Sequence, residues 1–153
     1  MSSHGSGLAL RSAVNQAEWQ RVDALARLTL AQAQSRWPEQ QARLWAQADG
    51  QWVRHHASFG VACVGGLCAA EPPWAPAVLS GDADDPALQY QGELGQRVLR
   101  RPRYVWALLG QLPDGRLAYR LTVRAWGLDS RAVVTLNTLW LVTPPELIEL
   151  IGG

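Results

Sequence analysis

The last third of the chain limits the possible folds most, because its side chains follow the two-residue period of a β-sheet. Apolar and polar residues alternate along residues 117–126, residues 104–109 form one apolar run, and residues 132–142 are rich in Val, Leu, Thr and Trp. Residues 112–115 (LPDG) are a turn sequence, since Pro presets φ and Gly accepts a positive φ. Residues 127–130 join the second apolar segment to the third. These segments predict a three-stranded antiparallel meander.

The first part of the chain predicts one long helix. Residues 8–34 contain no Gly or Pro and are rich in Ala, Leu, Gln and Arg, which favour helix. At about 1.5 Å per residue this helix would be roughly 40 Å long, too long for one small core to cover, so its first turns should project. Trp19 and Leu30 lie nearly opposite its main apolar stripe. That stripe, which Arg21 interrupts, has a period near 3.6 and comprises Leu10, Val14, Ala17, Ala24, Leu25, Leu28 and Ala31.

The segment that follows predicts shorter elements. Pro38 disfavours helix at Trp37, so we expect the long helix to end there and a second helix to cover residues 39–48. The Asp49-Gly50 pair is a turn signal that would close this second helix. Residues 52–56 are expected to form a short strand, and residues 57–102, rich in Gly, Pro, Ala and Asp, a long irregular loop.

One helix, an irregular middle and a meander together predict an α+β fold with segregated elements. The apolar face of residues 117–126 would pack on the helix, and the face with Arg120, Thr122 and Arg124 would be wetter. The chain of 153 residues is long enough for one domain with its own core. We expect residues 1–7 to be a tag or linker, residues 8–142 one globular domain, and residues 143–153 a C-terminal extension.

Cys63 and Cys68, in the sequence CVGGLC, are the only cysteines in the chain. A thioredoxin-like redox pair has two residues between its cysteines, and here there are four. A zinc site needs four ligands, and the remaining candidates, His55 and His56, would point to opposite sides of an extended chain. The VGGL linker can bring the two Cα atoms within bonding range, so we expect a local disulfide, with two unlinked buried thiols as the alternative. A disulfide implies an oxidising compartment.

No segment carries the pattern of an active site. The serines lack a nucleophile-elbow motif, and the acidic run at residues 82–85 lacks the ligand spacing of an EF-hand. A net charge of +1 gives no overall field that would attract nucleic acid or anionic lipid. We therefore expect a non-enzymatic protein with no catalytic residues, no cofactor, no bound metal and no nucleic-acid partner.

Eight Trp residues against one Phe is an unusual composition. Trp carries a large apolar area, and we expect most of these side chains to pack in the core. The alternative is a Trp-rich recognition surface for a glycan or a host surface, with Trp74 in EPPWAP as its candidate residue.

Three stretches resemble the PilX-type minor pilins of type IV pili. The helical segment RSAVNQAEWQRVDALARLTLAQAQ is similar to the family's Asn followed by polar and Ala-rich turns. CVGGLC with PPW downstream resembles its Cys-Gly-Leu-Cys loop and Pro-Trp. RPRYVWALLG and AYRLTVRAWGLDSRAVVTLNTLW resemble its Pro-x-Tyr strand, Tyr-Arg-Leu-Thr-Val strand, Gly turn and Val-rich final strand. Together they span residues 10–142.

The resemblance implies a pilin-like fold and a subunit that assembles with other minor pilins, with a tip adhesin as a further partner. It implies an anchor helix upstream of this chain, a place in the inner membrane facing the periplasm, and later a place at the pilus tip. The partner-binding residues would then be Leu10, Val14, Ala17 and Trp19 on the projecting helix, together with Trp74. A type II secretion pseudopilin is the near alternative.

Overall fold

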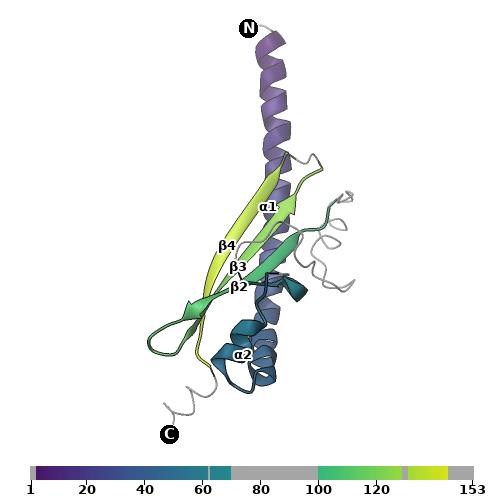
Figure 1. Cartoon of the computed structure of the whole chain (residues 1–153). Helices are drawn as coiled ribbons and strands as arrows, with labels where there is room; N and C mark the ends of the chain where they lie inside the picture. Colours follow the sequence, from purple (N-terminus) through teal and green to yellow (C-terminus); the bar gives the residue numbers. More distant parts are fainter. Residues whose placement is uncertain (1–2, 62, 70–99, 129–130, 145–153) are drawn as a thin grey trace.

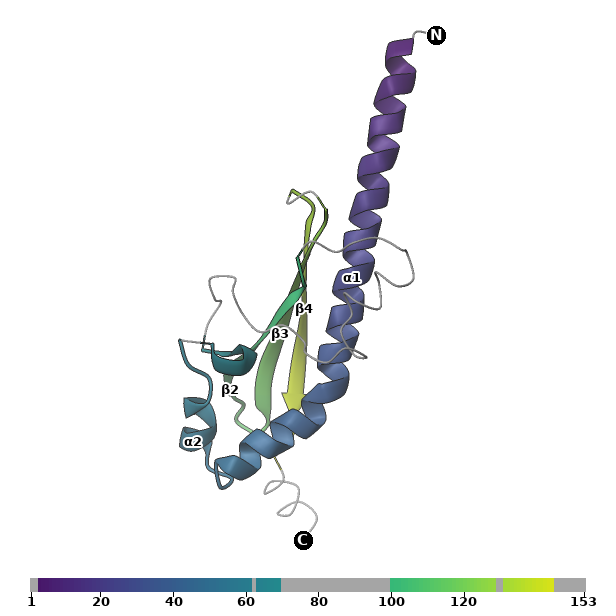
Figure 2. The same cartoon turned by 90° about the vertical axis from the view of Figure 1, so that its right-hand side faces the viewer.

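The computed structural model describes residues 3–61, 63–69, 100–128 and 131–144, with side chains from Gln16 onward. A long helix lies along one face of a four-stranded sheet, with a short helix and a disulfide loop at one end (Figures 1 and 2). This is the α+β, pilin-like architecture that the sequence predicts. Its elements are α1 (Ser3–Gln47), α2 (Trp52–Ala57), the 3-10 turn η1 (Val64–Gly66), β1 (Leu67–Cys68), β2 (Arg103–Gln111), β3 (Leu117–Trp126) and β4 (Val133–Val142).

The sheet has the order β1-β2-β3-β4. The predicted antiparallel meander is confirmed as β2, β3 and β4, and Leu117 pairs with Val142 at one end of a β3–β4 ladder that shows no irregularity. Between β2 and β3 the register shifts at Leu108 and Gly110, which leaves Leu109 as an extra residue in a β-bulge. The two-residue strand β1, which pairs in parallel with β2, was not predicted, because two residues are too few to show a period.

The helix α1 continues through Pro38, so the predicted break at Trp37 is wrong. Proline removes one helical hydrogen bond and its ring crowds the preceding turn, which kinks a helix without always ending it. Figure 2 shows the last turns of α1 bending away from the axis of the earlier turns. The helix also begins at Ser3, before the predicted start at residue 8.

The end of α1 is closed by the predicted Asp49-Gly50 turn. The Gly50 N–H donates to the Trp45 carbonyl and the Asp49 N–H to the Ala46 carbonyl, both at 3.0 Å, which is a Schellman motif. Asp49 and Gly50 both have positive φ, 55° and 68°. The chain then enters α2, so the short strand predicted at residues 52–56 is wrong. This helix holds His55 in the core, a long-range contact that a local pattern does not show.

The face of α1 that meets the sheet differs from the predicted stripe by roughly a third of a turn at 3.6 residues per turn. Only Leu25 belongs to both; Ala17 and Ala31 are exposed, while Ala24 and Leu28 are half-buried. The true stripe contains polar side chains that hide it in the sequence. Thr29 is buried because its hydroxyl donates to the Leu25 carbonyl at 2.9 Å. The buried residues of α1 are Val22, Leu25, Ala26, Thr29, Ala33, Trp37, Gln41 and Trp45.

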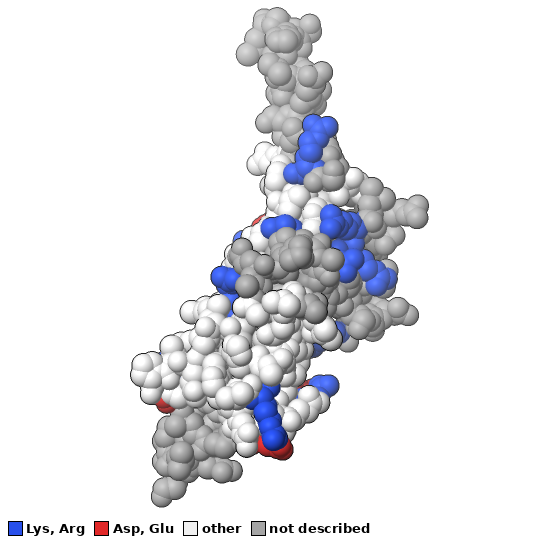
Figure 3. Space-filling view, viewed as in Figure 1, with Lys and Arg blue, Asp and Glu red and all other residues white. Residues whose placement is uncertain are grey.

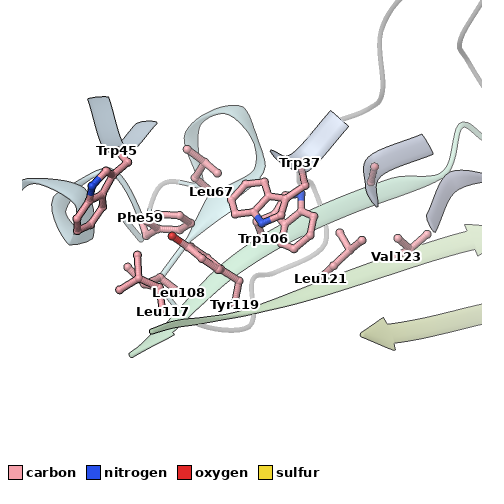
Figure 4. Close-up of a cluster of buried hydrophobic side chains, with 11 residues drawn as sticks. Trp37, Trp45, Phe59, Leu67, Trp106, Leu108, Leu117, Tyr119, Leu121 and Val123 are labelled. Atoms are coloured by element: carbon pink, nitrogen blue, oxygen red, sulfur yellow. The ribbon is translucent and has the colours of Figure 1, made fainter. Parts of the chain in front are cut away.

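The main core lies between the C-terminal half of α1 and the sheet, and Trp37 is at its centre (Figure 4). The Trp37 and Trp106 rings stack with centroids 3.9 Å apart, and Tyr119 meets Trp37 edge-on at 4.9 Å. Six of the seven described Trp residues are buried or half-buried, so the prediction that most Trp residues pack in the core is confirmed for them. They are Trp37, Trp45, Trp52, Trp106, Trp126 and Trp140, and the seventh, Trp19, is 45% exposed.

A smaller core cluster joins α1, about halfway along the helix, to the end of the sheet where β3 turns into β4. Val22, Leu25 and Ala26 pack there against Ala125 and Ala132. Beside it, the Glu18 carboxylate accepts a hydrogen bond from the Leu128 N–H at 2.7 Å. The helix is therefore held to the sheet at two levels.

The two faces of β3 are both more covered than the sequence predicts. Leu117, Tyr119 and Leu121 face α1 and are fully buried, as expected. On the other face Thr122 is also buried, with its hydroxyl donating to Asn137 Oδ1 at 2.7 Å. Trp126 is 7% exposed, and the Arg100 guanidinium lies 3.6 Å from its ring centroid. The expected wet face is therefore only partly wet.

Candidate interaction surface

The N-terminal turns of α1, up to about Glu18, are the first candidate surface, because they extend beyond the strands (Figures 1 and 2). The first described contact of α1 with the sheet is made by Glu18, and its first buried residue is Val22. Ala17 and Trp19 are exposed just before that point. Leu10 and Val14 lie in α1 farther toward the N-terminus, and their side chains are outside the described residues, as is the whole of Trp74.

The region around Trp19 combines an aromatic ring with paired charges. Glu18 and Arg21 form an ion pair at 3.7 Å, and the Arg27 guanidinium donates to the Asp23 carboxylate at 2.8 Å. These are helix pairs at i,i+3 and i,i+4, so part of the charge on this surface is balanced locally. Such a surface can pack against another helix. Its described residues include no nucleophile with a base beside it.

A second candidate surface, which the sequence analysis missed, lies on β4 and the adjoining outer face of the sheet. Leu139 and Leu141 are 61% and 46% exposed there, and Leu109 in the β2 bulge is 50% exposed. Leu141 and Leu109 lie at one level of the sheet, since Leu141 pairs with Ala118 and the bulge faces Ala118 from the other side. Figure 3 shows mostly uncharged surface over the lower part of this view. The continuous apolar run LWLV at residues 139–142 was the available signal, since it puts apolar side chains on both faces of the strand.

A buried polar group of three side chains joins α1, α2 and β3. His55 Nε2 lies 2.6 Å from the Tyr119 hydroxyl, and Gln41 Nε2 donates to the same hydroxyl oxygen at 3.4 Å. Because the Gln41 amide nitrogen can only donate, we assign the Tyr119 hydrogen to His55 Nε2, which makes His55 a neutral imidazole with its proton on Nδ1. All three residues are buried.

Burial determines the ionisation of this polar group. Loss of water on burial lowers the pKa of His55. The backbone of Leu44 has a smaller effect in the opposite direction, although Nδ1 makes no hydrogen bond of normal geometry, and the charge of His56 lowers the pKa further. Burial raises the pKa of Tyr119 to about 12, against a smaller opposing effect of Gln41. Both groups are therefore neutral near pH 7, and their role is to connect three elements of the fold.

The two cysteines form the predicted disulfide. Cys63 and Cys68 are bonded, with their Cα atoms 4.4 Å apart. Cys63 has a positive φ of 54° and Gly65 one of 65°, which gives the tight reversal that a ring of this size needs. Cys68 is fully buried and Leu67 beside it joins the main core, so the bond ties the η1 turn to the sheet.

The described residues show neither a metal-binding cluster nor a membrane-spanning helix. His55 faces the core while His56 is exposed, and no group of three or more His, Cys, Asp or Glu side chains in the described ranges could hold a metal ion. Within the same ranges, no helix combines the length and apolar character needed to cross a membrane.

Comparison of the chain with protein-family models, with curated proteins and with solved structures finds no match.

Proposed function

We propose that this chain is the periplasmic domain of a PilX-type minor pilin, a non-enzymatic subunit that assembles with other minor pilins in the priming or tip complex of a type IV pilus. The observation that carries the proposal is the long helix α1, whose N-terminal turns extend beyond the sheet and which exposes Ala17 and Trp19. A projecting helix of this length gains stability mainly by packing on other helices.

The disulfide supports an exported location for this domain. Disulfides persist in oxidising compartments such as the periplasm and are rare in the cytosol. In the proposed setting the native protein is anchored in the inner membrane by a helix that precedes α1, faces the periplasm, and later takes its place at the pilus tip.

The adhesion alternative has less support, because six of the seven described Trp residues serve the core. Trp19 and Trp74 are the residues left to such a role. A type II secretion pseudopilin would have the same architecture, and the neighbouring genes would separate it from a minor pilin.

The proposal is tested by co-purification of this domain with the soluble domains of minor pilins encoded beside it. Ala17→Glu and Trp19→Ala should each abolish retention, because a carboxylate or a lost ring disrupts helix packing, while thermal unfolding is unchanged. Val53→Glu is the matched control, since Val53 is 76% exposed on α2, away from this part of α1.

Two results would contradict the proposal. One is a full-length gene without a prepilin leader followed by an apolar stretch of about 20 residues. The other is retention of the same partners by both α1 variants.

A further inference from the structure

We propose that the open edge of β4 accepts an extended segment of another protein as an additional strand of the sheet. In the part of the chain that the structure describes, β4 pairs with β3 along all ten of its residues and has no strand on its other side. A strand edge of this kind presents unpaired backbone N–H and C=O groups, which another strand can satisfy.

β4 lacks the features that usually prevent such pairing. Natural edge strands are protected by proline, charged side chains, bulges or shortness. The sequence VVTLNTLWLV contains no proline and no charged residue, and the β3–β4 register has no bulge. The opposite side of the sheet differs, since β1 covers two residues of β2, and β2 itself contains a bulge.

The side chains beside this edge indicate the chemistry of the segment that would fit. On the outer face of β4, Thr135 and Asn137 are exposed toward one end and Leu139 and Leu141 toward the other. Cross-strand pairs favour an apolar residue opposite an apolar one and a hydroxyl opposite a hydroxyl. Because β4 offers no counter-charge, the matching segment is uncharged, with small polar residues at one end and apolar residues at the other.

The orientation of α1 favours a different protein over a second copy of this chain. Antiparallel pairing is the more stable ladder, and two copies that joined their β4 strands in this way about a two-fold axis would direct their α1 helices in opposite directions. Subunits anchored through α1 in one membrane would have these helices parallel. This step rests on the proposed function; the open edge itself does not.

The edge can be tested by amide hydrogen exchange on the whole chain, with and without an uncharged synthetic peptide, acetylated and amidated at its ends, whose first half is threonine and serine and whose second half is valine and leucine. In the free chain, alternate amides of β4 should exchange fast, because those that face β3 are bonded and those that face outward are not. The peptide should slow the outward amides at least about tenfold. The same peptide with N-methylated backbone amides should have no effect.

Variants locate the effect. Leu139→Lys should abolish the slowing, because it puts a charge at the edge. Val53→Lys, which changes another exposed apolar residue, on α2, should leave the slowing intact. Both variants should unfold at the temperature of the unchanged chain, which separates loss of binding from loss of fold.

Three results would overturn the inference: β4 amides that are all slow in the free chain, a peptide without effect, or a dimer that Leu139→Lys dissociates, which would identify a second copy as the occupant. The outcomes also separate the two proposals. If the peptide fails but Ala17→Glu still abolishes co-purification, the proposed function stands without the strand. If the peptide binds but the gene carries no prepilin leader, the edge stands and the proposed function fails.

Discussion

Gly127 directly follows β3 and lies close against α1. A Cβ atom at this position would lie 2.1 Å from Glu18 Oε1 and 3.0 Å from Val22 Cγ2. The same carboxylate oxygen accepts the Leu128 N–H, so it cannot move aside without losing that bond. Position 127 therefore has no room for a side chain and requires glycine.

Gly127→Ala should lower the free energy of unfolding by about 1–3 kcal/mol, the usual cost of overpacking a well-filled site. The measurement is urea denaturation. In a Glu18→Ala background the cost of the same change should be smaller, because the group that it meets is gone. Equal costs in both backgrounds would show that Glu18 is not the obstacle.

His55 gives the stability of the fold a dependence on pH. Its pKa is lowered in the folded chain by burial, so below its ordinary pKa of about 6.5 the unfolded chain binds more protons than the folded one. Stability should therefore be complete above that pH and fall as the pH decreases from about 7 to 5.

The test is the free energy of unfolding at several pH values for the native chain and for His55→Gln, which does not titrate in this range. We expect the variant to be less stable at pH 7, since the bond to Tyr119 is altered, and to show a flatter profile between about pH 7 and 5. Parallel profiles would contradict this role of His55.

At the scale of elements, the strands were far easier to predict than the helices. The alternation along residues 117–126 located β3 at its observed ends, because a two-residue period is unambiguous when one face is fully buried. The packing face of α1 was missed, because Thr29 and Gln41 on it are polar and become favourable there only through bonds to Leu25 and Tyr119. Pro38 was given too much weight as a helix end.

The candidate surfaces could be predicted only in part from the sequence. The projection of α1 followed from its length alone. Trp19 is exposed because it precedes Val22, the first buried residue of the helix, although it lies on the same helix face as Val22 and Ala26. The predicted meander places residues 132–142 at an edge of the sheet. Whether another segment covers that edge could not be predicted, because β1 pairs with β2 and not with β4 through contacts that no local pattern shows. The disulfide was predictable because its ring is local.

Loss of the disulfide should loosen the η1 turn and β1 locally and leave the rest of the fold intact. A ring of this size is expected to contribute about 2 kcal/mol by constraining the unfolded chain. Replacing both cysteines with serine should therefore lower the free energy of unfolding by about that amount and speed amide exchange at Leu67, while the Trp37–Trp106 stack keeps its near-UV signal. Loss of that signal in the native state would show that the bond supports the whole core.

In the molecule as a whole, buried Trp residues contribute to stability, whereas the exposed Trp19 is available for surface contacts. Trp37→Ala removes a fully buried ring that meets Trp106 and Tyr119, and should cost about 3–5 kcal/mol, a large share of the total stability of a domain. Trp19→Ala removes a half-exposed ring and should change stability by less than about 0.5 kcal/mol. Thermal unfolding of the two variants compares them directly, and equal losses would contradict the assigned positions.

The two levels of contact between α1 and the sheet also determine how the domain responds to force. Figure 1 shows the helix running roughly along the strands, so tension at its N-terminal end acts parallel to the helix–sheet interface. The Glu18 bond, the small cluster around Val22 and the stacked Trp37 and Trp106 would then share the load. Shear along such an interface strains many contacts at once, whereas peeling would break them in turn. The domain is thus arranged to withstand pulling through its own long helix.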